Sequence, residues 1–220
     1  MEIPESGHLG YSLKTMGQPM SIPLPPPSQK GGMALEEAIA RRRSVRDLTT
    51  QPILKSQLSQ ILWSAQGITG TWEEYRAVPS AGATYPLEIF ILCGQNTVEG
   101  LDAGIYHYDI AHHSLITLVK RDSRLELARA ALAQVFIEDA SLSIVICAEY
   151  ERTKRRYGNR GERYVHIEAG HAGQNIYLQA NALGLATVAI GAFYDEPVRQ
   201  VLRLEKQYQP LYIMPVGKPA

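Results

Sequence analysis

Residues 164–183 read YVHIEAGHAGQNIYLQANAL and form the longest helical pattern in the chain. One stripe of small or apolar side chains repeats at helical spacing, and its members are Val165, Ala169, Ala172, Ile176, Ala180 and Leu183. Gly170, Gly173 and Tyr177 fall on other faces, and a helix that is apolar or small nearly all round is normally buried. Gly184 supplies a C-terminal cap. The stretch therefore predicts a long helix buried in the core or at a subunit contact.

Shorter patterns on both sides of this helix alternate between helix and strand. Helices are expected at residues 34–43, 55–67, 123–134 and 196–202, and strands at 87–93, 104–109, 114–119, 142–148, 185–190 and 211–216. Residues 150–163 are polar and basic and favour a loop. The mixture predicts an α+β domain over residues 33–220. The Pro- and Gly-rich N-terminal arm before it, residues 1–32, is expected to run extended.

Composition excludes several classes of function. The 220 residues hold 22 basic and 22 acidic side chains, and this balance argues against a general nucleic-acid or membrane binder. No apolar run approaches the ~20 residues of a membrane span. The first residues do not resemble a signal peptide, so we expect a cytoplasmic protein. Cys93 and Cys147 each end a strand-like run and are expected to be buried, free thiols.

The run Ala40–Asp47, ARRRSVRD, concentrates four arginines and one serine where the helix over residues 34–43 ends. Arginines near a helix C-terminus gain about 0.3–1 kcal/mol each from the macrodipole, which is the ordinary explanation. It accounts for one or two arginines better than four, because Arg41, Arg42 and Arg43 step about 100° apiece around a helix. The alternative is anion capture, since guanidinium groups bind phosphate bidentately and the Ser44 hydroxyl adds a donor.

Two further segments are poor in large side chains. Residues 79–86, PSAGATYP, are either a tight turn before a strand or a loop whose backbone approaches a flat ligand. Gly191–Ala192 carries the same ambiguity at the carboxyl end of a strand, where ligands of α/β proteins bind.

Other familiar sites lack support in the sequence. Neither G-x-G-x-x-G nor a P-loop occurs, and Ser80 is not part of a nucleophile elbow. His166 and His171 are five residues apart, about 140° around a helix, so one metal ion cannot easily bind both. We expect no metal site.

Taken in chain order, four motifs resemble the FMN-dependent nitroreductase superfamily, and within it the SagB-type dehydrogenase branch, whose azoline-oxidising members act on ribosomal peptides. The motifs are residues 42–46, RRSVR; 79–88, PSAGATYPLE; 168–175, EAGHAGQN; and 189–193, AIGAF. The resemblance covers about residues 22–218. It implies a nitroreductase-like fold with a central mixed, mainly antiparallel sheet flanked by helices. It also implies a homodimer with the long helix at its interface and two FMN sites between the subunits.

The resemblance implies roles for particular residues. Arg42, Arg43 and Ser44 would hold the phosphate and ribityl chain of FMN, and Arg46 would lie nearer the flavin ring. The residues that would contact the ring are Pro79, Ser80, Ala81 and Gly82 from the partner subunit, together with Ile190, Gly191 and Ala192 beside the flavin N5. Gln134 and Lys218 are expected as further contacts.

The implied activity is that of an oxidoreductase with alternating half-reactions. NADH, NADPH or an organic donor would reduce FMN, which would then reduce a small nitro or quinone acceptor; dehydrogenation of a peptide or metabolite is the related possibility. A Lys-Tyr pair precedes the long helix in the azoline oxidases, and Arg156-Tyr157 stands in that place here. Arginine is not deprotonated at working pH and is a poor base, so Tyr157 is the candidate catalytic residue. The alternative function is a catalytically weak flavin-binding or peptide-docking scaffold.

Overall fold

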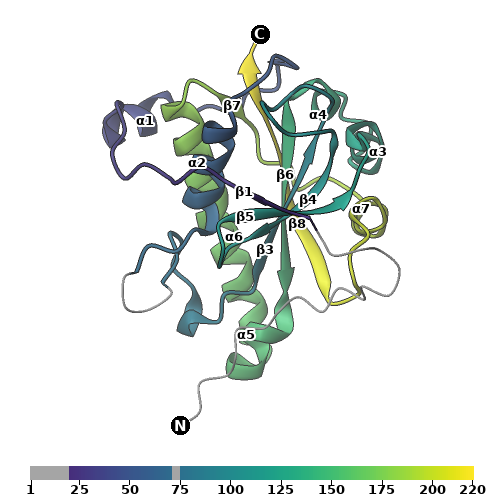
Figure 1. Cartoon of the computed structure of the whole chain (residues 1–220). Helices are drawn as coiled ribbons and strands as arrows, with labels where there is room; N and C mark the ends of the chain where they lie inside the picture. The colour runs from purple at the N-terminus through teal and green to yellow at the C-terminus, as the bar shows by residue number, and fades with distance from the viewer. Residues whose placement is uncertain (1–19, 71–74) are drawn as a thin grey trace.

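The computed structural model describes residues 20–70 and 75–220 (Figure 1). Within these residues eight strands form one sheet in the order β1-β5-β4-β3-β6-β8-β2, and β7 pairs with β8. The strands are β1 Ser21–Pro23, β2 Leu48–Thr49, β3 Leu87–Cys93, β4 Gly104–Asp109, β5 Ser114–Val119, β6 Leu142–Glu149, β7 Ala186–Thr187 and β8 Tyr208–Pro219. All of these strand pairs are antiparallel, and an isolated bridge between Ile53 and Val98 is parallel.

Helices cover both faces of the sheet. They are α1 Leu35–Arg41, α2 Lys55–Gln66, the 3-10 turn η1 Ala81–Ala83, α3 Arg124–Ala130, α4 Phe136–Asp139, α5 Tyr150–Tyr157, α6 Arg160–Ala182 and α7 Asp195–Leu202. In β3, Ile89 and Ile91 pack in the cluster formed with α2 and α6, whereas Phe90 and Leu92 pack in the cluster formed with α3 and α7. Successive side chains of a strand point to opposite faces, so this continuous apolar run is buried because both faces are covered. The α+β fold with helices flanking the sheet is confirmed.

The long helix α6 extends from α5 at one end of the molecule to α1 at the other (Figure 1). Its 23 residues span about 34 Å at 1.5 Å per residue. Its apolar stripe is buried against α2 and the sheet, but another side is exposed in the single chain. Ile167 is 46% exposed, and His166, Gly170, His171 and Gln174 lie exposed around it. The expected burial on all sides is therefore absent from the single chain, and a subunit contact over this face stays a prediction.

Residues 150–163 are helical, and the expectation of a loop was wrong. The segment contains α5 and the start of α6, separated by Gly158 at φ 57°. Arginine, lysine and glutamate have good helix propensity, but the only buried side chain of α5 is Thr153. Because the segment has no stripe of apolar side chains, its hydrophobic periodicity did not indicate a helix.

Several element boundaries also differ from expectation. The helix α1 ends at Arg41, so Arg42 and Arg43 are outside it. The helix expected to reach residue 134 ends at Ala130, because Leu132 and Ala133 adopt positive φ angles of 58° and 57°. Of the strand expected over residues 185–190, only the two residues of β7 are paired as a strand. The strand β8 has 12 residues and is twice as long as the strand expected over residues 211–216.

The described part of the N-terminal arm joins the sheet edge. β1 pairs with β5, and the Leu24 amide donates to the carbonyl of His113 at 3.1 Å. Residues 1–19 of the arm lie outside the described residues. Cys93 and Cys147 are buried and free, as expected. None of the helices in residues 20–70 and 75–220 has the length and apolar character needed to cross a membrane.

Candidate functional site

The arginine run leaves α1 and is attached to α6 and β7. Arg42 has φ −52° and ψ 121°, which ends the helix. The Val45 amide donates to the carbonyl of Thr187 at 3.0 Å, and Ser44 Oγ lies 2.9 Å from the Tyr177 hydroxyl. Tyr177 also accepts a hydrogen bond from the Ala189 amide at 2.7 Å. Since the phenol oxygen already accepts one bond, it is suited to donate to Ser44, which leaves the Ser44 proton for a ligand.

The four arginines of the run have different partners. Arg41 forms an ion pair with Glu37 at 2.6 Å within α1, and Arg43 donates to two nearby backbone carbonyls. Arg42 stacks over the Tyr177 ring at 5.1 Å, and Arg46 lies 6.0 Å from the Phe136 ring. Among the described residues, neither Arg42 nor Arg46 has a carboxylate partner. Their guanidinium groups are therefore free to bind a phosphate or another anion.

The turn at Gly191–Ala192 is held in place from two sides. Ile190 and Ile213 exchange backbone hydrogen bonds of 2.9 and 3.0 Å, and Gln134 Nε2 donates to the Ala192 carbonyl at 3.0 Å. Within the described chain the amides of Gly191 and Ala192 have no hydrogen-bond acceptor. A Cβ added to Gly191 would meet only Tyr212, at 3.9 Å. The turn thus offers free N–H groups on an open surface that a flat ligand can approach.

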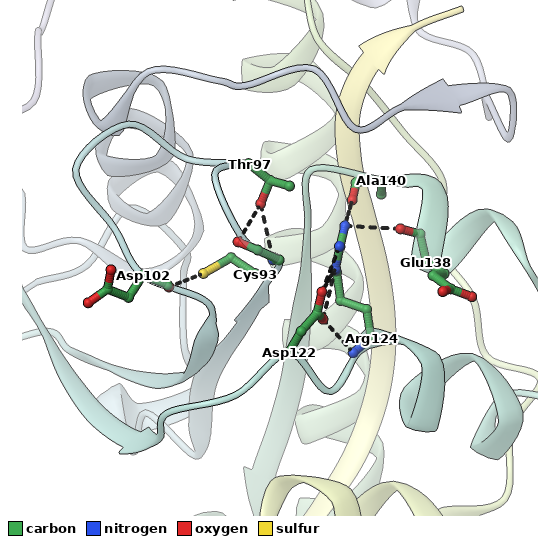
Figure 2. Close-up of polar contacts among 8 residues, drawn as sticks. Cys93, Thr97, Asp102, Asp122, Arg124, Glu138 and Ala140 are labelled. Atoms are coloured by element: carbon green, nitrogen blue, oxygen red, sulfur yellow. Dashed lines mark hydrogen bonds and ion pairs between the residues drawn. The ribbon is translucent and has the colours of Figure 1, made fainter.

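The segment that carries Gln134 and Phe136, from the end of α3 into α4, is fixed by a buried arginine. Arg124, only 7% exposed, donates through Nη1 to the carbonyls of Glu138 at 3.0 Å and Ala140 at 2.6 Å (Figure 2). Asp122 holds the other side of the guanidinium at 2.7 Å. The arginine is thereby anchored on both sides and ties the start of α3 to the end of α4. No sequence signal identified this role, because a charged side chain at position 124 looks like an ordinary surface residue.

Lys218 reaches the same end of the molecule through strand pairing. It stands opposite Thr49 in the β2–β8 pair, and β2 follows directly after the arginine run. The predicted residues Arg42, Ser44, Arg46, Gln134, Ile190, Gly191, Ala192 and Lys218 therefore gather around β7 and the carboxyl end of α6. We call this group the arginine-run site. Tyr177 and Phe136 join it, and the sequence did not single them out.

Pro79, Ser80, Ala81 and Gly82 lie elsewhere, against α5. The Gly82 carbonyl accepts a bond from Arg156 Nη1 at 3.1 Å, and Ser80 Oγ accepts one from the Tyr85 amide at 2.9 Å. Gly82 has φ 60°, and a Cβ there would lie 2.5 Å from the Tyr157 hydroxyl. Both features favour glycine at this position. The loop over residues 79–82 and the pair Arg156-Tyr157 thus form a second group, which we call the loop group.

A buried polar cluster underlies the loop group. Glu168 of α6 is 2% exposed and Gln66 of α2 is fully buried, and among the described residues Glu168 Oε1 and Gln66 Nε2 have no hydrogen-bond partner. Burial raises the pKa of Glu168 to about 7, and the nearby Ser80 hydroxyl, Arg76 guanidinium and Gln66 amide oppose this rise. The cluster therefore contains a carboxyl group that titrates near neutral pH. The sequence placed Glu168 in a motif but gave it no role.

The two groups contact different parts of α6 in one chain. Tyr157 packs edge-on against Tyr164 near the start of the helix, with ring centroids 5.1 Å apart, whereas the arginine-run site contacts Tyr177. Thirteen residues of helix correspond to about 20 Å. A single chain therefore does not bring the loop group into the arginine-run site.

Comparisons with known proteins point to one family. The Nitroreductase family model matches residues 39–218. The chain is 46% identical over 203 residues to MJ1384, a nitroreductase-type protein of Methanocaldococcus jannaschii, covering 92% of this chain and 98% of that protein. A nitroreductase-type protein of Ralstonia eutropha JMP134 superimposes with a TM-score of 0.80 at 27% identity, over 91% and 90% of the two chains.

More distant relatives have more specific names. The trifolitoxin-processing protein TfxB of Rhizobium leguminosarum is 29% identical over 134 residues, which are 59% of this chain and 36% of that protein. The FMN reductase (NAD(P)H) of Bacillus subtilis is 23% identical over 198 residues, 84% of this chain and 65% of that protein. The matched range includes the arginine run, the loop at 79–82, the Gly191 turn and Lys218. The chain belongs to the nitroreductase family.

Proposed function

We propose that this protein is an FMN-dependent oxidoreductase that transfers hydride from NADH or NADPH to a small nitro or quinone acceptor. Family membership and the similarity to an FMN reductase support the reaction class. The observation that carries the proposal is the arginine-run site itself. Arg42 and Arg46, which have no carboxylate partner among the described residues, lie with Ser44 on the segments that Tyr177, Gln134 and Phe136 connect to the Gly191 turn.

The residues present fit the chemical groups of FMN. Arg42, Arg43 and Ser44 supply cations and a hydroxyl donor for a phosphate. Gly191 leaves open space in front of Tyr212, so the backbone can approach a flat ring. Gln134 and Lys218 add polar groups at the same end of the molecule. The site therefore offers donors and positive charge with few side chains in the way, as a bound flavin mononucleotide requires.

FMN, when bound, supplies the redox chemistry by accepting hydride and passing it to the acceptor. The chain supplies position and charge. Arg46 carries a positive charge that stabilises negative charge on a bound ring, and the amides of Gly191 and Ala192 are preorganised donors. Ile190 is hydrogen-bonded to Ile213, and Ala192 is hydrogen-bonded to Gln134. The amides of the turn are therefore already held in place before a ligand binds.

We further propose that each site is completed by a second copy of the chain. In one chain, about 20 Å of α6 separates the loop group from the arginine-run site. The face of α6 between them is exposed around Ile167. Pairing of two α6 helices over this face would bury it and carry the loop of one chain toward the arginine-run site of the other. This pairing forms a homodimer, and we propose that it works in the cytoplasm.

Binding of FMN compared with riboflavin tests the proposal. Riboflavin lacks the phosphate, so the protein should bind FMN at least about tenfold more tightly than riboflavin if the arginines hold that group. The difference should shrink in high salt. Equal affinities for FMN and riboflavin would refute a phosphate site at Arg42 and Ser44, and failure to bind either would refute the proposed function.

A second candidate function is dehydrogenation of a peptide, which the similarity to TfxB favours. Arg156 stands where the azoline oxidases have lysine, so the only candidate base of that pair is Tyr157. An azoline peptide should be oxidised by the wild-type protein and not by Tyr157→Phe if this function applies. A protein that binds FMN but turns over neither nicotinamides nor peptides would instead be a flavin-binding scaffold.

A further inference from the structure

The junction between α5 and α6 holds an excess of positive charge in a chain with no net charge. Residues 149–163 contain six basic residues and three carboxylates. Glu149 pairs with Arg152, and both Glu151 and Glu162 pair with Lys154. Among the described residues, this leaves four arginines without a carboxylate partner, and we call them the basic rim: Arg155, Arg156, Arg160 and Arg163.

Aromatic rings hold two arginines of the basic rim in place. Arg156 lies 5.7 Å from the centroid of the Tyr157 ring, and Arg160 lies 5.9 Å from that of Tyr164. The two tyrosines pack edge to face at 5.1 Å. A guanidinium over a ring keeps its N–H edges free while losing conformational freedom, so it is preorganised for a planar anion.

The basic rim is continuous with the loop group. Arg156 Nη1 donates to the Gly82 carbonyl, and the Tyr157 hydroxyl occupies the space that a Gly82 side chain would need. Arg155, Arg160 and Arg163 are exposed, and Arg160 stacks on Tyr164, the ring that packs against Tyr157. The rim therefore borders the same loop that the proposed function carries to the flavin of the partner chain.

We propose that the basic rim binds an anionic group of the substrate, a carboxylate or a phosphate, and so selects acidic substrates. This inference rests on the proposed function for the location of the reaction. The anion has two possible sources, the extra phosphate of NADPH or an acidic group on the acceptor. The chemistry is the same for both, namely recognition of an anion by paired guanidinium forks.

Two matched pairs of probes distinguish the sources. NADP⁺ and NAD⁺ differ by one phosphate, and 4-nitrobenzoate and 4-nitrobenzyl alcohol differ by one carboxylate. Calorimetric binding of each compound is measured on the wild type, on Arg160→Gln/Arg163→Gln and on Arg203→Gln, an exposed arginine after α7 that lies outside the rim. Binding is measured on the protein as purified, so this readout does not require turnover.

We expect the double variant to lose about tenfold in affinity for the anionic member of one pair, with the neutral analogue or NAD⁺ unchanged. Arg160→Lys/Arg163→Lys should restore part of the loss, and added salt should reduce the wild-type preference. Loss confined to NADP⁺ identifies the donor as the source, and loss confined to 4-nitrobenzoate identifies the acceptor. The proposal would be overturned if the wild type bound the two members of each pair with equal affinity. It would also be overturned if Arg203→Gln lost as much affinity as the double variant. A protein that prefers the anions but never binds FMN would overturn the proposed function alone.

Discussion

The Tyr177 hydroxyl lies 2.9 Å from Ser44 Oγ and 2.7 Å from the Ala189 amide, so one side chain of α6 joins the arginine run to the segment between β7 and Gly191. Ser44 is 133 residues from Tyr177 along the chain, and Ala189 is 12 residues from it. The phenol oxygen sets their relative position together with the backbone hydrogen bond from Val45 to Thr187, and Arg42 stacks on the same ring.

Replacing this phenol by phenylalanine should weaken both the fold and the site. In Tyr177→Phe the half-buried Ala189 amide loses its acceptor, which costs about 1–3 kcal/mol of unfolding free energy. FMN affinity should fall with it, because Ser44 loses its partner. Chemical denaturation and FMN titration measure the two effects. Tyr194→Phe is the control, because the Tyr194 side chain is 60% exposed and its hydroxyl has no hydrogen-bond partner in the described chain; equal effects in both variants would contradict the role of Tyr177.

Removal of one free cation should affect ligand binding with little effect on folding. Arg42→Gln removes a guanidinium that has no carboxylate partner in the described chain, so FMN affinity should drop about 10- to 100-fold, while loss of the contact with the Tyr177 ring should lower the free energy of unfolding by no more than about 1 kcal/mol. Arg41→Gln is the matched control, because Arg41 is paired with Glu37 inside α1. If Arg41→Gln weakened FMN binding as much as Arg42→Gln, the assignment of roles within the run would be wrong.

A methyl group at Gly191 tests the open face of the turn. Gly191→Ala should fold normally, because a Cβ there would meet only Tyr212 at ordinary contact distance. It should lower FMN affinity, because the methyl group occupies space in front of the backbone amides. Circular dichroism melting and FMN titration check the two parts, with Gly32→Ala as a control in open space. Unchanged FMN affinity would show that the ligand does not approach this turn.

Glu168 should make stability depend on pH in a predictable direction. Its pKa is raised from 4.5 to about 7 by burial, so the folded state holds the proton more tightly than the unfolded state. The resulting stabilisation is complete below pH 4.5 and is lost as the pH rises through about 7. It amounts to roughly 3 kcal/mol.

The variant Glu168→Gln keeps the shape of the neutral acid and cannot titrate. Its unfolding free energy should therefore fall less than that of the wild type between pH 5 and pH 8. Urea titrations at the two values measure the difference. Glu99→Gln, at an exposed glutamate, should follow the wild type. Parallel pH profiles for the wild type and Glu168→Gln would show that Glu168 does not hold a proton near neutrality.

The sequence predicted those parts of the fold in which side-chain pattern and burial agree. The apolar run at 87–93 and the stripe through Val165 and Ile176 both became core elements. α5 was missed because its helical character rests on propensity and on one buried residue, Thr153. A helix without an apolar face leaves no hydrophobic periodicity in the sequence.

The candidate site was predicted in part for a similar reason. Positive charge and small residues are visible in a sequence, so Arg42, Ser44 and Gly191 could be selected. The contacts that order them are not visible, because Tyr177 acts through a hydroxyl, Arg124 through backbone carbonyls and Glu168 through burial. Only the fold brings these partners together.

The visible absorbance spectrum of the purified protein, followed during addition of NADH or NADPH, tests the central claim most directly. The account predicts the yellow absorbance of a bound flavin that persists through gel filtration and is bleached by one of the two nicotinamides, then restored by a quinone. A protein that stays colourless after incubation with FMN, or a flavin band that neither nicotinamide bleaches, would contradict it.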